Sequence, residues 1–324
     1  KVTKLNQIKN FLGGNADPEI INQYSVFPIN MGSFNFYENS KNDNLLIKNI
    51  DQITNLSIPK NKTYFLTVNE NVEFLKINLQ DPQTSKAIIT GNFSNNFKLI
   101  TKSEKSLIQN ENIRYDDMLI TSCITVLDAH LNKAKFDITG GGCEDSINFI
   151  RSRGNIEYIH VNNSPYDAID MDFSNLEIQE VKVNNAGNDC FDVSGGHYSL
   201  NEAELNNCGD KGISVGEKSN VSLGKIKVLN SRAGIAVKDS SKLWLNSLNG
   251  LNLKDNCFEA YNKKQEFNGG EIFYNTLDCD RGIDKDSYSL VEKVEKDDLC
   301  LKSFNFLKNN ICLTNNKIKV SWVK

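Results

Sequence analysis

The sequence predicts an all-β fold, a single-stranded right-handed parallel β-helix in which each turn of the coil takes 22 residues. Three observations support this prediction: a repeat of that length, two columns of apolar residues, and a column of Asn residues. No helical period is present, and β-branched residues recur in pairs, which favours strands. Successive repeats begin at Cys143, Pro165, Gly187 and Gly209.

Apolar residues recur at the same two places in every repeat. A strand sends alternate side chains to opposite faces, so a column that faces the core must be apolar in each turn. The first column contains Ile147 and Phe149, Ile169 and Met171, Phe191 and Val193, Ile213 and Val215, and Ile235 and Val237. The second contains Ile159 and Val161, Val181 and Val183, Ala203 and Leu205, and Ile226 and Val228. We therefore expect two inward-facing strands per turn.

A third aligned column consists of Asn residues, which are expected to stack their side-chain amides at a corner of the coil. Its members are Asn163, Asn185, Asn207 and Asn230. Because this polar column keeps the same register as the two apolar columns, all three indicate the same coil.

The prediction divides the chain into three parts. Residues 1–54 are expected to form an irregular N-terminal segment or cap. Residues 55–278 are expected to form the β-helix, with regular turns over 143–256, and residues 279–324 a C-terminal cap. Caps are expected because an uncovered coil end would expose unpaired strand edges.

Composition limits the classes of partner. The 37 basic and 41 acidic residues are interspersed and give a net charge of −4, so no basic stripe for nucleic acid is present. No apolar run is long enough to cross a membrane. The chain begins at Lys1 rather than Met, which fits removal of a leader and a secreted or cell-surface protein. A homo-oligomer is compatible with these features.

The eight Cys residues leave two alternatives open. They are either buried free thiols stacked inside the coil or disulfides of a secreted protein. In the second case, Cys279, Cys300 and Cys312 are candidates to pin the C-terminal segment. No CxxC pair is present and there are only three His residues, so a zinc site is not expected.

Carboxylates recur at outward positions beside the first apolar column. Asp170 and Asp192 occupy the same place in successive turns and should lie about 4.8 Å apart. Asp172 lies on the far side of the same strand. A second column just before the strand runs Asp145, Asp167, Asp189 and then Lys211. Like charges this close raise each other's pKa unless something compensates them.

Three compensations are possible. In a catalytic interpretation, Asp167, Asp170, Asp189, Asp192 and Lys211 divide the roles of acid, base and nucleophile at a glycosidic bond. In a metal interpretation, the same four Asp residues hold Ca²⁺, and Lys211 or a neighbouring cation acts as base against a sugar acid. In a structural interpretation, Asp and Asn side chains bind backbone N–H groups in the turns.

The runs SPYDAIDMDFS, NAGNDCFDVSGG, NCGDKGISVGEKS and GIAVKDSS resemble right-handed parallel β-helix modules of bacterial and archaeal exported or surface proteins. Such modules include those that follow CotH-kinase-like domains. More remotely, the stacked Asp turns are similar to the β-helices of polygalacturonases, polysaccharide lyases and C5-epimerases that act on polyuronates. A polygalacturonase-like site would require a His in the groove, whereas His197 lies outside the strand column.

The remote resemblance implies an acidic polysaccharide as the ligand. The residues expected to bind it are Arg151, Asp172, Arg232, Lys238, Tyr261 and Lys263. We therefore expect an exported carbohydrate-active protein, with lyase or epimerase chemistry slightly favoured over hydrolysis and Ca²⁺ as a possible cofactor. The alternative from another class is a non-catalytic surface or structural module that binds a glycan or a protein.

Overall fold

The structure is a computed structural model that describes residues 20–21, 24–28, 35–38, 45–105 and 120–295. The chain divides into two compact units: Lys1–Asn155 with His160–Asp172, and Ile156–Ile159 with Phe173–Lys324. Strands and no helix occur in the described ranges. Their parallel pairing confirms the predicted right-handed parallel β-helix. The residues described also contain no helix long and apolar enough to span a membrane.

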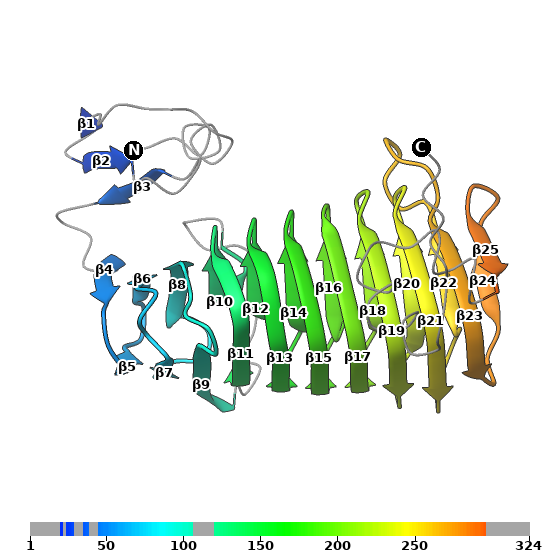
Figure 1. The fold of residues 1–324 in the computed structure, drawn as a ribbon, viewed down its shortest axis with the longest axis horizontal. Helices are drawn as coiled ribbons and strands as arrows, with labels where there is room; N and C mark the ends of the chain where they lie inside the picture. Colours follow the sequence, from blue (N-terminus) through cyan, green and yellow to red (C-terminus); the bar gives the residue numbers. More distant parts are fainter. Residues whose placement is uncertain (1–19, 22–23, 29–34, 39–44, 106–119, 296–324) are drawn as a thin grey trace, which may run out of the picture. The chain divides into compact units, whose positions relative to one another are not determined.

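In the first unit, even-numbered and odd-numbered strands form two separate parallel sheets, called here the even sheet and the odd sheet (Figure 1). The even sheet contains β4 (Leu45–Ile50), β6 (Thr63–Val68), β8 (Lys86–Gly91), β10 (Ser122–Leu127), β12 (Asp145–Ile150) and β14 (Asp167–Asp172). The odd sheet contains β5 (Thr54–Ile58), β7 (Phe74–Leu79), β9 (Lys98–Lys105), β11 (His130–Gly141) and β13 (Arg153–Ser164). Parallel pairing thus begins at β4, inside the segment expected to be irregular.

Three short strands precede the coil in sequence. They are β1 (Ile20–Ile21), β2 (Tyr24–Pro28) and β3 (Asn35–Glu38). They pair antiparallel with one another in a small sheet of their own.

The second unit repeats the two-sheet arrangement. Its even sheet contains β16 (Phe191–Ser194), β18 (Lys211–Gly216), β20 (Ala233–Lys238), β22 (Phe258–Tyr261) and β24 (Ile283–Lys285). Its odd sheet contains β15 (Asn175–Ala186), β17 (His197–Cys208), β19 (Asn220–Leu229), β21 (Lys242–Leu251), β23 (Glu271–Cys279) and β25 (Leu290–Lys293). Each strand pairs in parallel with the equivalent strand of the next turn, as in a coil.

The predicted apolar columns form the core. In the second unit Phe191 pairs with Ile213, Ile213 with Ile235, and Ile235 with Phe258, and all four side chains are fully buried. The first unit places Ile147 beside Ile169 in the same way. Burial of such a side chain contributes about 1.5–3 kcal/mol relative to exposure, so the column stabilises every turn.

The Asn column is confirmed at one corner of the second unit. Asn185, Asn207, Asn230 and Asn252 all adopt a left-handed backbone, which Asn tolerates better than most residues. Asn207 donates a side-chain hydrogen bond to Asn185 (2.8 Å), and Asn252 donates one to Asn230 (3.0 Å). The ladder changes register once, because the Asn230 amide donates to Asn206 rather than to Asn207.

Six cysteines pair in three disulfides: Cys123–Cys143, Cys190–Cys208 and Cys257–Cys279. Each joins the beginning of an even-sheet strand to the end of the next odd-sheet strand and so closes one turn. The free-thiol alternative is therefore wrong for these six residues. Cys279 pairs with Cys257, not with Cys300 or Cys312, which lie outside the described residues.

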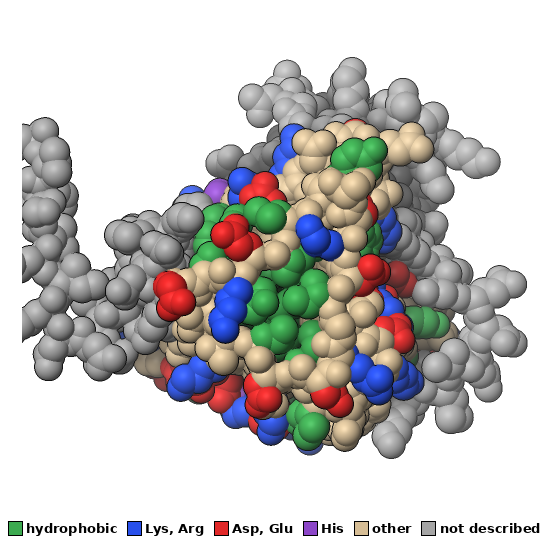
Figure 2. All heavy atoms as spheres, turned by 90° about the vertical axis from the view of Figure 1, so that its right-hand side faces the viewer, with side chains coloured by type: hydrophobic (Ala, Val, Ile, Leu, Met, Phe, Trp, Pro, Cys, Tyr) green, Lys and Arg blue, Asp and Glu red, His purple; other side chains and the backbone are tan. Residues whose placement is uncertain are grey.

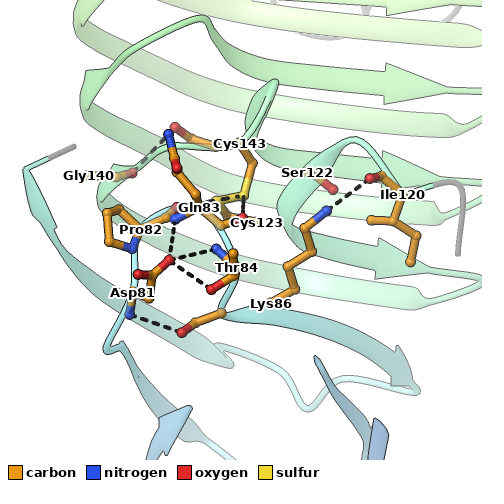
Figure 3. The surroundings of a disulfide bond; sticks show 12 residues. Asp81, Pro82, Gln83, Thr84, Lys86, Ile120, Ser122, Cys123, Gly140 and Cys143 are labelled. Atoms are coloured by element: carbon orange, nitrogen blue, oxygen red, sulfur yellow. Dashed lines mark hydrogen bonds between the residues drawn. A yellow bond between two sulfur atoms is a disulfide. The ribbon is translucent and has the colours of Figure 1, made fainter. Parts of the chain in front are cut away.

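The first-unit disulfide lies against a tight loop that precedes β8 (Figure 3). The Asp81 carboxylate accepts hydrogen bonds from the backbone N–H of Gln83 (3.2 Å) and Thr84 (3.0 Å), which fixes the loop. The Pro82 carbonyl accepts a hydrogen bond from the Gly142 N–H (2.6 Å), next to Cys143. Covalent and polar links thus hold the same corner.

The last described turn leaves part of the core column open. Ile283 pairs with the fully buried Phe258, yet 42% of its own surface is exposed because no described turn covers it. Leu290 on β25 is 39% exposed. Figure 2 shows apolar side chains in the middle of this face, with acidic and basic side chains around them.

Candidate functional site

Successive turns of the second unit bring acidic and basic side chains together along the even sheet. Most members lie just before an even-sheet strand or on its outward side, where the repeat places them one turn apart. We call this set the charged cluster: Asp189, Asp192, Asp210, Lys211, Arg232, Lys238, Asp255, Glu259 and Tyr261.

Asp189 and Lys211 form the buried centre of the charged cluster. The backbone N–H of Lys211 donates to Asp189 Oδ1 (2.9 Å), and the Lys211 ammonium lies 3.8 Å from the same oxygen. Lys211 also forms an ion pair with Asp210. The sequence column predicted that Lys211 would follow Asp189 by one turn, and the structure confirms the contact.

Burial raises the pKa of the Asp189 carboxyl to about 6, and the negative charge of Asp192 adds to the rise, although Lys211 opposes it. Burial alone would lower the pKa of Lys211, but Asp189 and Asp210 outweigh it, so that pKa is raised. Asp192 Oδ1 is buried and has no hydrogen-bond partner among the residues that the structure describes. The centre therefore holds a carboxyl group that gains or loses its proton near neutral pH.

Arg232 binds three carboxylates at once. Its guanidinium contacts Asp210, Asp255 (2.7 Å) and both oxygens of Glu259 (3.1 and 3.2 Å). Planar guanidinium groups are suited to such bidentate contacts. These hydrogen bonds keep the pKa of Arg232 above its usual value despite burial. Arg232 thus links three turns of the even sheet through ion pairs.

Lys238 and Tyr261 complete the charged cluster. Lys238 extends back over the preceding turn, where its ammonium donates to Ser214 Oγ (2.7 Å). Burial raises the pKa of Tyr261, although Lys211 and Lys238 oppose the rise. Lys263, which was also predicted to bind substrate, is exposed, and its backbone N–H donates to Asp239 (2.8 Å).

Predicted acidic residues of the first unit lie around Asn148. The Asn148 amide donates to Asp170 (3.0 Å) and to Asp172 (2.9 Å). Burial raises the pKa of Asp145 well above its usual value, although a hydrogen bond involving Thr121 opposes the rise. Neighbouring carboxylates raise this pKa further, among them Asp167 in the same column. Within the described part of the chain, Asp145 Oδ2 and Asn148 Oδ1 are buried and have no hydrogen-bond partner.

Arg151 forms an ion pair at a corner of the first unit. Its guanidinium makes a bidentate ion pair with Asp128 (2.9 and 2.6 Å), one turn earlier. Both residues adopt a left-handed backbone. The charge that was predicted to bind substrate is therefore already paired within the protein.

The predicted metal ligands are divided between the two units, and the prediction that all four bind one ion is not tested. Asp167 and Asp170 belong to the first unit, whereas Asp189 and Asp192 belong to the second. Within the described ranges, no three His, Cys, Asp or Glu side chains are grouped so that they could hold a metal ion. A Ca²⁺ site in either unit would have to use neutral oxygens as well, and it stays a prediction.

Sequence reasoning missed three members of the charged cluster: Asp210, Asp255 and Glu259. A signal was present for two of them. Asp210, Arg232 and Asp255 each stand shortly before an even-sheet strand, so they form a corner column of alternating charge. Glu259 follows a longer connection that breaks the repeat, which hides its alignment with Ala236, Ser214 and Asp192.

The raised pKa of Asp189 makes a prediction about stability. A carboxyl whose pKa is higher in the folded state than in the unfolded state loses stability as pH rises through the folded pKa. Wild-type protein should therefore lose stability between about pH 4 and pH 6 in a way that Asp189→Asn does not. By pH 8 the variant should be more stable by on the order of 3 kcal/mol.

Urea unfolding of both proteins at pH 4 and pH 8 measures this difference. Asp278→Asn, which removes an exposed carboxylate bonded to Asn249 on the odd sheet, is the control and should show no such gain. A loss of stability in Asp189→Asn at both pH values would contradict the assignment.

Comparisons with protein-family models, with curated proteins and with solved structures found no match to this chain.

Proposed function

We propose that this protein is an exported carbohydrate-active β-helix protein that binds and cleaves an acidic polysaccharide along the charged cluster. The observation that carries the proposal is the buried carboxyl of Asp189, which lies 3.8 Å from the Lys211 ammonium and whose pKa is raised to about 6 by burial and by the charge of Asp192. Glycosidases commonly cleave the glycosidic bond with two carboxyl groups, one that donates a proton and one that acts as nucleophile or as base toward water. The three disulfides, which are typical of oxidising compartments, support export.

The raised pKa values of Lys211 and Tyr261 disfavour these two side chains as the base of a lyase or an epimerase, and we therefore propose hydrolysis. Abstraction of a proton beside a sugar carboxylate needs a side chain that has lost its own proton. The pKa values of Lys211 and Tyr261 are both raised, so both hold their protons. In the proposed reaction Asp189 gives its proton to the leaving glycosidic oxygen, and Asp192 acts as nucleophile or as base toward water. Lys238 attracts the carboxylates of the substrate, while Lys211 is paired with Asp210 and Asp189.

The second candidate is a non-catalytic module that binds a glycan or a partner protein. One observation favours it: the guanidinium of Arg232 is fully engaged by Asp210, Asp255 and Glu259. Charged side chains that pair with one another in this way stabilise the coil and leave fewer charged groups to bind a substrate.

A screen on acidic polysaccharides tests the proposal. The purified chain is incubated with polygalacturonate and alginate, with and without Ca²⁺, while reducing ends and the absorbance of unsaturated products are followed. New reducing ends without absorbance identify hydrolysis, and absorbance identifies a lyase. Asp189→Asn and Asp192→Asn should each lower the rate by about 10²-fold or more, as expected for a lost catalytic acid or base.

The matched control is Asp278→Asn, which should retain the wild-type rate. No product on any substrate, together with wild-type stability of Asp192→Asn, would contradict catalysis and favour the non-catalytic module. A rate that depends on Ca²⁺ would support the calcium prediction.

A further inference from the structure

Phe173 is an aromatic residue held out in solvent at a corner of the second unit. Its side chain is 61% exposed, although Phe is among the residues most often buried. It follows Asp172 in sequence and its backbone N–H donates to the carbonyl of Ser194 (2.9 Å), the last residue of β16. The ring therefore lies at the end of the strand that carries Asp192.

The backbone of Phe173 is left-handed, with φ of 51°. This conformation costs a residue other than Gly on the order of 1 kcal/mol, and bulky residues rarely adopt it. The next turn uses Gly195 at the equivalent corner, with φ of 57°. Gly or Asn would suit this backbone conformation better than Phe.

The surroundings hold the ring in place. A Cβ atom on Gly195 would lie 2.7 Å from the Cδ1 and Cε1 atoms of Phe173, so the ring lies directly against the glycine backbone. Beneath the corner, the buried Tyr198 hydroxyl donates to the Ser194 carbonyl (3.1 Å) and accepts from the Ser174 N–H (3.1 Å). One face of the ring thus packs on a fixed corner, while most of its surface remains open to solvent.

Ser194, which accepts the hydrogen bond of the Phe173 N–H, lies on the strand that carries Asp192. Ser194 stands two residues after Asp192 on the same strand and so on the same face, about 7 Å farther along. That is roughly the length of one pyranose ring. A sugar bound against Phe173 would place its neighbour beside Asp192.

We propose that Phe173 is a stacking platform for one pyranose ring of the acidic polysaccharide, next to the ring that meets Asp189 and Asp192. This inference rests on the proposed function and adds a binding subsite to it. An exposed apolar ring face offers sugar C–H groups a surface that excludes water, and the glycine beneath it keeps that surface ready before binding.

Binding of polygalacturonate and alginate hexamers to the full chain, measured by calorimetry, tests the platform. Phe173→Asn should weaken binding about tenfold, as expected when a stacked ring is lost, whereas Phe173→Trp should retain it. Phe173→Asn should also raise the midpoint of urea unfolding, because Asn accepts the left-handed backbone more readily. Tyr288→Asn, at an aromatic residue that is 75% exposed elsewhere in the second unit, is the control and should change neither quantity.

Three results would overturn the inference, and they are distinguishable from one another. If Phe173→Asn binds the hexamers as tightly as the wild type while Asp192→Asn is inactive, Phe173 is not a stacking platform, and the proposed function is unaffected. A lower unfolding midpoint for Phe173→Asn shows that the ring serves folding. Absence of hexamer binding by the wild-type chain removes both the platform and the proposed function.

Discussion

Replacing Arg232 with Met is expected to lower the free energy of unfolding by about 3 kcal/mol, because breaking a buried ion pair leaves an uncompensated charge. The charge is that of Glu259, whose side chain is 11% exposed and which both guanidinium NH groups contact. Asp255 is about half exposed and should contribute little, and Asp210 keeps its ion pair with Lys211. Urea unfolding measures the change.

Two further variants separate this effect from a general loss of charge. Lys227→Met breaks an exposed pair with Glu204 and should cost less than about 1 kcal/mol. The double variant Arg232→Met, Glu259→Met removes the mostly buried Glu259 charge together with its cation and should recover much of the lost stability. If Arg232→Met cost no more than Lys227→Met, the ion pairs across the even sheet would be unimportant for the fold.

Removing the Cys190–Cys208 disulfide is expected to lower the free energy of unfolding by about 3 kcal/mol, because the bond closes a loop with a sequence separation of 18 residues. The double variant to Ala should unfold at lower urea concentration. It should also slow the proposed reaction, because Cys190 follows Asp189 and Cys208 stands two residues before Asp210. Loss of the bond frees the corner that positions both carboxylates.

A peptide map under non-reducing conditions shows first whether the bond exists. It should contain the three crosslinked pairs, with Cys190 joined to Cys208. The Cys123–Cys143 bond closes a loop of similar length in the first unit. The Cys123→Ala, Cys143→Ala variant should therefore lose similar stability without the same loss of rate. Free thiols at Cys190 and Cys208 in the purified wild-type chain would refute the pairing.

The fold could be predicted because a coil repeats its constraints in every turn. An inward position such as Ile213 or Ile235 has to be apolar whenever it recurs, so alignment of the repeats reveals the core directly. The Asn corner is visible for the same reason. The strand pairing before Asn55 was not predicted, because the first turn departs from the 22-residue length.

The candidate site could be predicted only where its residues share the repeat. The contact of Asp189 with Lys211 follows from their positions in one column, and it is confirmed. The bidentate contact of Arg232 with Glu259 does not, because the connection that carries Glu259 has a different length. The ion pair of Arg151 with Asp128 could not be predicted, because Asp128 belongs to an earlier and less regular turn.

Disulfide pairing and backbone handedness depend on corner geometry that a column does not reveal. Cys190 and Cys208 stand at the start and the end of one turn, but only the path of the chain shows that these ends meet. Likewise, Phe173 aligns with Gly195, and the left-handed backbone that both adopt became visible only in three dimensions.

The proton affinity of Asp189 is the central claim of this account, and a carboxyl titration by NMR tests it most directly. Protein labelled with ¹³C at Asp carboxyl carbons is titrated from pH 3 to pH 9, and the signal that is missing from Asp189→Asn is followed. The account predicts that this signal titrates with a pKa of about 6. A titration complete below pH 4 would contradict the account, because Asp189 would then hold no proton to donate near neutral pH.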